Sequence, residues 1–446
     1  MGELSIDTIP SDNNSIDKLY TLLTNDDEDA RVCKDIPESS CRHMPVNFFS
    51  YLTANVLTKI ADELSSARLV LPWLLGSLGA PAVFVSMLVP VREAGVLLPQ
   101  MLVAAYIRRL ARRKYMWMLG AALSAAMLLL IALVAPMVSG ATAGWVILGA
   151  IVLYSLARGI CSVAAKDVLG KTVSKTRRGA LMGYATSIAG AATLLVGLGV
   201  ETAGRDIESM QLLAGFILAA TCLWLGAIVL FGNIREAAGA TEGGGNAISV
   251  AVESLGLLKT DRDFRRFVLM RSSLLSTALV IPFVVLLLQQ SSQTTLGLGL
   301  LIIASGLADI VASPVWGRLS DRSSRLVMAI GALSSGLCCL FIGFAATFYS
   351  EWLESAFFGA LCFFLIAMSH SGVRLGRKVY LVDMATVDTR SSYVAVSNTV
   401  IGIAILVAGS IGFLADIWGT SAVIVVLGVI ACLAAVQAYT LRDVSG

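Results

Sequence analysis

From residue 46 onward, the chain alternates between long apolar runs and short polar or basic segments. An α-helix rises about 1.5 Å per residue, so about 20 apolar residues cross the roughly 30 Å of hydrocarbon in a bilayer. The pattern therefore predicts an all-α membrane protein with twelve spanning helices. We expect these helices at residues 50–78, 82–107, 115–137, 143–166, 180–201 and 211–231, and then at 265–290, 296–317, 326–348, 355–378, 392–415 and 420–440.

The composition supports this class. Of 446 residues, 57% are hydrophobic and 14% charged, and the mean hydropathy is +0.81, which is too apolar for a soluble domain. The first 45 residues differ, with ten Asp or Glu against four Lys or Arg, and we expect a mostly disordered acidic tail there. The expected order is this tail (1–45), a six-helix bundle (46–231), a linker (232–264) with a short amphipathic helix at 248–258, and a second six-helix bundle (265–446).

A charged stretch, GRLSDRSSR at residues 317–325, lies between two apolar runs. Its Gly317, Asp321, Arg322 and Arg325 resemble the loop signature of the major facilitator superfamily, although Ser324 stands where that family usually has glycine. A weaker copy, AAYIRRLAR at 104–112, keeps Arg109 and Arg112 and lacks the aspartate. The resemblance implies two six-helix bundles that rock about a central cavity. It also implies that these two stretches form a gate on the cytoplasmic side, in which Asp321 pairs with an arginine across the gate.

The spacing of several residues predicts that the chain is an internal repeat. Arg109 and Arg322 are 213 residues apart, and an offset of 212 recurs in later helices, in the pairs Lys59 with Arg271, Lys166 with Lys378, Arg178 with Arg390, Gly190 with Gly402 and Gly197 with Gly409. An offset that persists from helix to helix indicates two halves in parallel orientation. Shifted by this offset, the polar loop at 289–295 coincides with the Gly and Pro of 76–82, which divides the first two spans. We expect Gly190 and Gly197 to allow close helix packing.

The distribution of loop charge predicts the topology. The loops at 108–114, 166–178, 318–325 and 374–390 hold most of the Lys and Arg, whereas those at 76–82, 138–142, 289–295 and 349–354 hold none. Basic loops remain in the cytoplasm, so both termini are expected there. The expected location is the cytoplasmic (inner) membrane of a bacterium.

Nine ionisable residues fall inside the expected spans: Lys59, Asp62, Glu63, Arg92, Glu93, Arg158, Arg271, Asp309 and Arg374. Facing lipid would cost about 2.5 to 3.5 kcal/mol for each charge at mid-depth, on the order of 25 kcal/mol in total, which exceeds the usual stability of a folded protein. The five positive and four negative charges nearly balance. They predict a polar cavity between the helices.

Several roles are open for these groups. Lys59 lies three and four residues before Asp62 and Glu63, so this trio could neutralise itself within one helix. A carboxyl group held away from water retains its proton more readily, so all four carboxylates are candidate proton carriers. Glu93 and Asp309 are favoured, because neither has an obvious partner on its own helix.

Arg158, followed by Gly159, resembles the fourth-helix arginine that the same superfamily associates with proton coupling. At the repeat offset it corresponds to His370, whose side chain titrates near neutral pH. His370 is therefore a candidate proton relay, and a hydrogen-bonded position in a helix interface is the alternative. Arg374, one turn later, could line the inner mouth with it or receive an anionic group.

The sequence thus predicts a secondary transporter for a small polar or charged solute, driven by a proton gradient and active as a monomer. Near balance of buried charge favours an organic anion, a zwitterion or a sugar-like molecule. A non-transporting receptor or assembly factor on the same fold is the alternative, and multidrug efflux is disfavoured because the fifth helix lacks the Gly-Pro pair of such exporters. No cofactor, catalytic constellation or metal site is predicted, because Cys33, Cys41 and His43 match no familiar zinc spacing.

Overall fold

The computed structural model describes residues 43–98, 103, 106–107, 109–203, 209–238, 256–291, 296–385 and 390–444. All regular elements in these ranges are helices. The expected acidic tail up to residue 42 lies outside the described residues, as does most of the expected helix at 248–258. The all-α class is confirmed.

The first half contains α3 (Met44–Leu64), α4 (Val70–Ser77), α5 (Ala82–Leu97), α7 (Lys114–Val134), the short 3-10 helix η1 (Ala135–Met137), α8 (Gly140–Thr172), α9 (Lys175–Ala203) and α10 (Ser209–Gly232). The second half contains α12 (Leu257–Thr260), α13 (Arg262–Ser273), α14 (Ser276–Ser291), α15 (Leu296–Arg322), α16 (Ser324–Phe348), α17 (Glu351–Glu354), α18 (Ala356–Met384), α19 (Arg390–Gly409), α20 (Gly412–Trp418) and α21 (Thr420–Tyr439). Among the described residues, ten helical segments are long and apolar enough to span a membrane. If α3 and α4 together are counted as one further span and α5 as another, the total is consistent with the twelve expected spans.

The first helix of each half is interrupted, whereas the sequence predicted continuous spans at 50–78 and 265–290. Residues 65–69 separate α3 from α4, and residues 274–275 separate α13 from α14. Pro72 explains the first break, because its ring has no N–H and clashes with the carbonyl group four residues earlier, that of Arg68. At α4, Pro72 lies in the first turn, where a missing N–H costs little.

The charged stretch at 317–325 is helical rather than an open loop. Helix α15 continues to Arg322, and α16 begins at Ser324, so Ser323 alone separates them. The basic side chains therefore project from the two helix ends that meet there.

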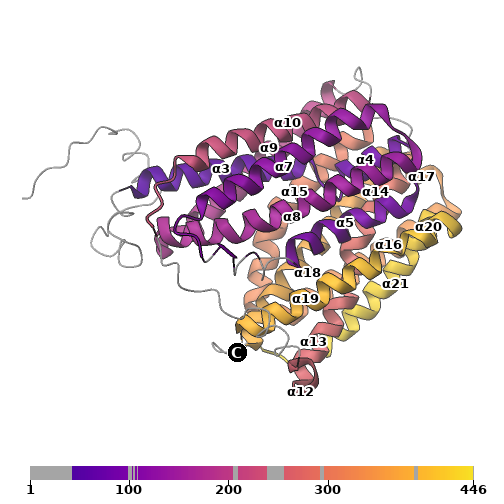
Figure 1. The fold of residues 1–446 in the computed structure, drawn as a ribbon. Coiled ribbons are helices and arrows are strands. Elements are labelled where there is room, and N and C mark those ends of the chain that lie inside the picture. Colours follow the sequence, from indigo (N-terminus) through magenta and orange to yellow (C-terminus); the bar gives the residue numbers. More distant parts are fainter. Residues whose placement is uncertain are drawn as a thin grey trace, which may run out of the picture.

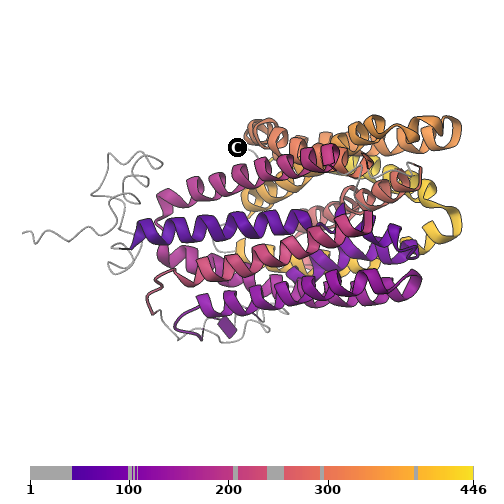
Figure 2. The ribbon, with the colours of Figure 1, turned by 90° about the horizontal axis from the view of Figure 1, so that it is seen from above.

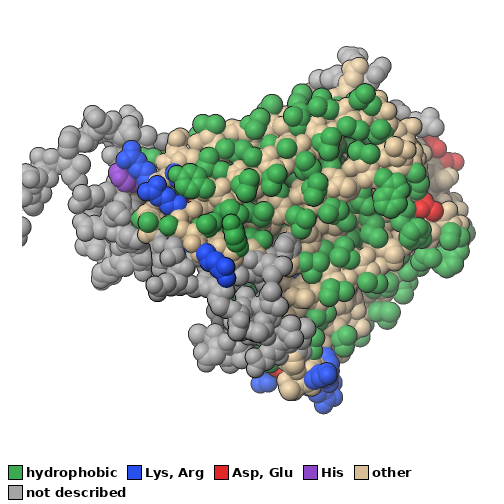
Figure 3. Space-filling view, in the orientation of Figure 1, with side chains coloured by type: hydrophobic (Ala, Val, Ile, Leu, Met, Phe, Trp, Pro, Cys, Tyr) green, Lys and Arg blue, Asp and Glu red, His purple; other side chains and the backbone are tan. Residues whose placement is uncertain are grey.

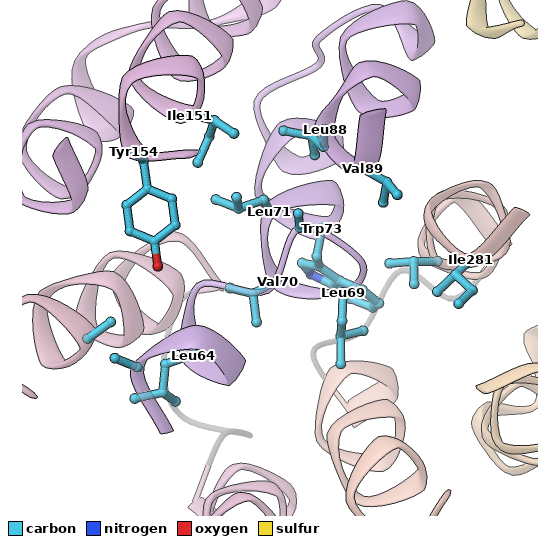
Figure 4. Packing of buried hydrophobic residues seen from close by; sticks show 14 of the residues in the cluster. Leu64, Leu69, Val70, Leu71, Trp73, Leu88, Val89, Ile151, Tyr154 and Ile281 are labelled. Carbon is cyan, nitrogen blue, oxygen red and sulfur yellow. The ribbon is translucent and has the colours of Figure 1, made fainter. Parts of the chain in front are cut away.

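The two halves cross and pack on each other along part of their length. Helix α9 packs on α15, α5 on α19 and α20, and α4 on α14. Figure 1 shows the two groups of helices close together around α4, α14 and α17 and spread apart toward the start of α3 and toward α12, and Figure 2 shows the same arrangement from above. Figure 4 shows the apolar packing near the first break, where the buried side chains of Leu69, Val70 and Trp73 lie near Leu88 and Val89 of α5.

Glycine allows close contact between α9 and α15. A Cβ atom added at Gly197 would lie 2.9 Å from the backbone nitrogen of Ile303, and one added at Gly190 would lie 3.7 Å from the Ile310 side chain. The expected packing role is confirmed for Gly197, between the two halves, whereas at Gly190 a Cβ atom would be at ordinary contact distance.

The outer surface divides by chemistry. Hydrophobic side chains cover the middle of the face seen in Figure 3, while Lys and Arg gather near the start of α3 and near α12, and Asp and Glu appear at the opposite end. Large apolar side chains such as Leu133, Leu195 and Val229 are more than half exposed. An apolar belt of this kind fits contact with lipid acyl chains. We call the two ends of the molecule the basic end and the acidic end.

Candidate transport cavity and gates

Asp62, near the end of α3, is the centre of the charged cluster in the first half. Its carboxylate accepts hydrogen bonds from Arg92 of α5 at 3.0 Å, from the Tyr154 hydroxyl of α8 at 2.9 Å, and from Arg158 of α8. Two of these bonds are also ion pairs. Asp62 is thus neutralised by arginines of other helices, and Lys59 makes no ion pair with any described residue.

A second ion pair lies at the break between α3 and α4. Arg68, in the interrupted segment, is 3.1 Å from the Glu93 carboxylate of α5. Both side chains remain about one-third exposed, at 28% and 36%. Glu93 therefore has a partner in the break between α3 and α4, although its own helix offers none.

The second half has its own charged groups. Arg374 of α18 lies 3.6 Å from Asp309 of α15, and both are partly exposed. Arg271 of α13 is buried and donates to the side-chain oxygens of Ser397 and Asn398 on α19.

His370 lies in a buried helix interface. Its Nδ1 atom is 3.1 Å from the Thr277 hydroxyl of α14, and its Nε2 atom is buried without a hydrogen-bond partner among the described residues. This placement agrees with the alternative interpretation, in which His370 is hydrogen-bonded within a helix interface. The ring is nevertheless within electrostatic reach of Arg374 and Arg68.

Two neighbouring cavities that share lining residues lie beside these clusters. One, of about 180 Å³, lies between the halves and is lined by Lys59, Asp62 and Glu63 of α3 and by Asp309 of α15, together with small residues of α9. The other, of about 280 Å³, shares Lys59 and Asp62 and extends along α8 past Arg158 to Lys166. Five of the nine ionisable residues expected inside the spans therefore line these cavities: Lys59, Asp62, Glu63, Arg158 and Asp309.

Glu63 differs from the other three carboxylates. Asp62, Glu93 and Asp309 each have an arginine partner, whereas Glu63 has no hydrogen bond or ion pair among the described residues. It lines the cavity between the halves with Asp62 and Asp309. Sequence reasoning favoured Glu93 and Asp309 as partnerless, but their partners come from elsewhere in the fold.

Four further cations belong to the same region, and sequence reasoning missed them. They are Arg68, Lys166, Arg377 and Lys378. Arg68 falls inside the expected first span, and the other three lie at the ends of expected spans, where they were counted as loop charge. The lining of the two cavities itself is balanced, with three cations (Lys59, Arg158 and Lys166) and three carboxylates (Asp62, Glu63 and Asp309).

The acidic end is closed by direct contacts between the halves. Asp416 of α20 accepts hydrogen bonds from the backbone N–H groups of Ala82 and Val83 at the N-terminus of α5, at 2.7 and 3.3 Å. The Ser86 hydroxyl donates to the Gly409 carbonyl at 2.7 Å. An anion at a helix N-terminus is favourable because it pairs with free N–H groups and with the helix dipole. We call Asp416 and the first turn of α5 the acidic-end gate.

A second contact strengthens this closure. Gln289, at the end of α14, donates to the Trp73 carbonyl at 2.9 Å and to the Ser77 hydroxyl at 2.8 Å. Both acceptors belong to α4 of the other half. The closure at the acidic end thus also involves α4 of the first half and α14 of the second half.

The basic end is open by comparison. Arg109, Arg112 and Arg322 are exposed, and no described hydrogen bond or ion pair joins their two segments. Arg325 pairs within its own half, 3.0 Å from Asp443. A Cβ atom added at Gly317 would meet nothing within 4 Å. The expected gate residues lie at this end, and the side chain of Asp321 is outside the described structure.

No group of three or more metal-ligating side chains occurs in the described part of the chain.

Comparisons with known proteins agree with this architecture. Residues 267–445 match the family model described as Major Facilitator Superfamily. No curated protein matches the chain. Among solved structures, a POT family transporter in complex with a thioalcohol-conjugated peptide has a TM-score of 0.68 at 14% identity and covers 90% of this chain and 97% of its own.

Two further structures show the same likeness. A D-xylose-proton symporter has a TM-score of 0.69 at 13% identity, with 90% of this chain and 99% of that chain covered. The nucleoside transporter NupG, as a mutant, has a TM-score of 0.63 at 12% identity, with coverage of 88% and 99%. The second half of the chain thus matches the Major Facilitator Superfamily model, and the described residues have the fold of these transporters.

Proposed function

We propose that the protein is a secondary active transporter that moves a small polar or charged solute across the cytoplasmic membrane of a bacterium by alternating access. The observation that carries this proposal is the cavity between the two halves, lined by Lys59, Asp62, Glu63 and Asp309. Asp416 joins the halves at the acidic end, and the helices spread apart toward the basic end (Figure 1). A cavity at a repeat interface, beside interrupted helices, is the usual place for a solute site in such transporters. The proposed function requires that the acidic-end gate open and the basic end close in a second state.

The orientation follows from charge. Lys and Arg side chains concentrate at the end where α3 begins, and basic segments favour the cytoplasmic face. We therefore place the basic end and both termini in the cytoplasm. In that orientation the structure represents the inward-facing state.

Proton coupling is assigned to Glu63 in this proposal. Its charged neighbours are Asp62 on α3 and Asp309 on α15, which disfavour a third negative charge, and Arg68 and Arg374, which favour it. Both arginines already pair with other carboxylates. A proton on Glu63 relieves the repulsion among three carboxylates, and closure at the basic end would bring the α3 and α15 carboxylates together.

The test is transport by purified protein in liposomes with an imposed pH gradient, using a panel of polar metabolites. We expect the gradient to drive accumulation of at least one solute by the wild type. In Glu63→Gln we expect exchange of that solute across the membrane to continue, while accumulation driven by the gradient is lost.

Glu351→Gln is the matched control, because Glu351 is an exposed glutamate at the acidic end, far from the cavity. Accumulation by Glu63→Gln at the wild-type level would remove Glu63 from the coupling step. Specific solute binding without any flux would refute transport and favour a receptor on the same fold.

A further inference from the structure

A groove lies between α13 and α21 on the surface of the second half. Its volume is about 300 Å³, and it is lined by Arg266, Leu269 and Met270 of α13 and by Gln437, Thr440 and Leu441 at the end of α21 and just after it. None of these residues lines either cavity beside the charged clusters. The groove is therefore separate from the proposed transport route.

The groove faces away from the interior of the second half. On the inner side of α13, Phe267 stacks on Tyr380 of α18, with ring centroids 5.3 Å apart. One turn later on that side, Arg271 donates to the Ser397 hydroxyl of α19. Leu269 lies on the opposite side of α13 and is 63% exposed. An exposed leucine on the outside of a spanning helix fits contact with lipid acyl chains.

Both helices change from apolar to polar at the level of the groove. Toward the basic end, exposed Leu269 is followed at intervals of three and four residues by Arg266 and Arg262, which are also exposed. On α21, Leu433 is 58% exposed, and Gln437 follows it one turn nearer the basic end. A phospholipid has the same order, with acyl chains in the hydrocarbon and a charged headgroup at the interface.

Positive charge is available at the polar end of the groove. Lys and Arg side chains gather around α12, beside the start of α13 (Figure 3). Arg262 and Arg266 make no hydrogen bond or ion pair within the described part of the chain. The two nearby carboxylates of α13 are engaged, because Asp263 lies 3.9 Å from Arg442 and Asp261 caps the start of the helix.

The first half lacks this polar end. At the repeat offset of 212, Ala54 of α3 takes the place of Arg266 and is fully buried. Leu225 of α10 takes the place of Gln437 and is 52% exposed. The arginine and the glutamine are thus not required by the helix packing that the two halves share.

We propose that the groove binds one anionic phospholipid of the leaflet at the basic end. The headgroup phosphate accepts hydrogen bonds from Arg266 and from the amide of Gln437, and an acyl chain lies along Leu269 and Leu433. Arginine suits this role because its planar fork donates two parallel hydrogen bonds to a phosphate. Basic pockets between spanning helices on the cytoplasmic side favour anionic headgroups. The inference concerns the outer surface and does not depend on the proposed transport function.

The experiment measures thermal unfolding of the purified full-length protein, freed of native lipid in a neutral detergent. The probes are dioleoylphosphatidylglycerol, dioleoylphosphatidylcholine, which has the same chains and no net charge, and glycerol 3-phosphate, which has no chains. A ligand that binds the folded state stabilises it by mass action. We expect the phosphatidylglycerol to raise Tm in a saturable way, with an apparent affinity about fivefold above that of the phosphatidylcholine, and glycerol 3-phosphate to leave Tm unchanged.

Variants test the assignment to Arg266 and Leu269. Arg266→Gln should lower the affinity for phosphatidylglycerol about fivefold, to the level of phosphatidylcholine, whereas Arg266→Lys keeps the charge and should retain most of the preference. Leu269→Ser should weaken both lipids alike, about fourfold, which corresponds to the loss of contact with about one CH₂ group.

Arg235→Gln is the matched control. Arg235 is an exposed arginine of the first half that bonds to Asn47 through its backbone, so its variant should respond to lipid as the wild type does. An equal phosphatidylglycerol response in wild type and Arg266→Gln, or an equal loss in Arg266→Gln and Arg235→Gln, would overturn the site. Equal affinity for the two lipids would refute its preference for anionic headgroups, and a response to glycerol 3-phosphate equal to that of the lipid would show that it binds a soluble phosphate instead.

Discussion

Replacement of Asp416 with alanine should shift the balance between the two states of the carrier. In the structure its carboxylate accepts both backbone N–H groups at the start of α5, across the interface between the halves. Loss of a side-chain cap costs about 1 kcal/mol, and loss of a negative charge at a helix N-terminus costs roughly 0.3 to 1 kcal/mol. Asp416 is exposed, so the lower values apply. A total of about 1 to 1.5 kcal/mol corresponds to a five- to tenfold shift toward opening of the acidic end.

Amide hydrogen exchange measures this shift. In Asp416→Ala we expect exchange at Ala82 and Val83, and in the neighbouring turn of α5, to accelerate about five- to tenfold, in line with the free energy above. If the halves move as rigid bodies, the segment that contains Arg109 and Arg112 should at the same time become more protected. Asn at position 416 keeps one acceptor oxygen and should show a smaller effect.

The control is Glu354→Ala, which removes an exposed carboxylate at the same end of the molecule that makes no described contact with the other half. Faster exchange limited to Ala82 and Val83, with no change at the basic end, would show that Asp416 only caps a helix. Identical behaviour of Asp416→Ala and Glu354→Ala would refute the gate.

Other predictions concern packing, ion pairing and pH. Gly412→Ala should also open the acidic end, because its added Cβ atom would lie 2.0 Å from the Ser86 hydroxyl. We expect a membrane-impermeant reagent added on that side to label this variant more than the wild type. Gly149→Ala is the control and should show no increase, because a Cβ atom added at Gly149 meets nothing within 4 Å. Asp62→Asn should lower stability by about 3 kcal/mol, since it leaves two arginines without their carboxylate, and a Tm equal to that of the wild type would contradict the cluster. Partial burial alone would raise the pKa of Asp261, but hydrogen bonds from Phe264 N–H, the Tyr393 hydroxyl and Asp263 N–H outweigh it and lower this pKa. Its cap on α13 should therefore contribute about 1 kcal/mol above pH 4, a contribution that disappears as the pH falls through the lowered pKa. Unfolding of Asp261→Ala followed from pH 7 down through the lowered pKa should converge with that of the wild type at the acid limit, and a constant difference over this range would refute the assignment.

Four cations near the charged clusters were not among the nine residues expected to form the cavity. They are Arg68, Lys166, Arg377 and Lys378, and Lys166 lines one of the two cavities. Arg68 could have been included, because it lies within the expected span 50–78. The other three could not be assigned from hydropathy, since the end of a spanning helix is also the place where loop charge accumulates.

The sequence alone determined the all-α membrane class of the protein, the order of its long apolar helices, and the presence of charges that require a polar interior. These properties follow from local patterns, because the length of an apolar run and the cost of a charge in hydrocarbon do not depend on neighbours in space.

Only the tertiary structure decided which charges pair and which end is closed. Asp62 is neutralised by residues 30 and 96 positions away, and Asp416 contacts Ala82 across 334 residues. No local pattern distinguishes Asp416 from any other aspartate that follows an apolar run. Its role depends on how two bundles meet, and that geometry arises from packing between segments that are distant in the chain.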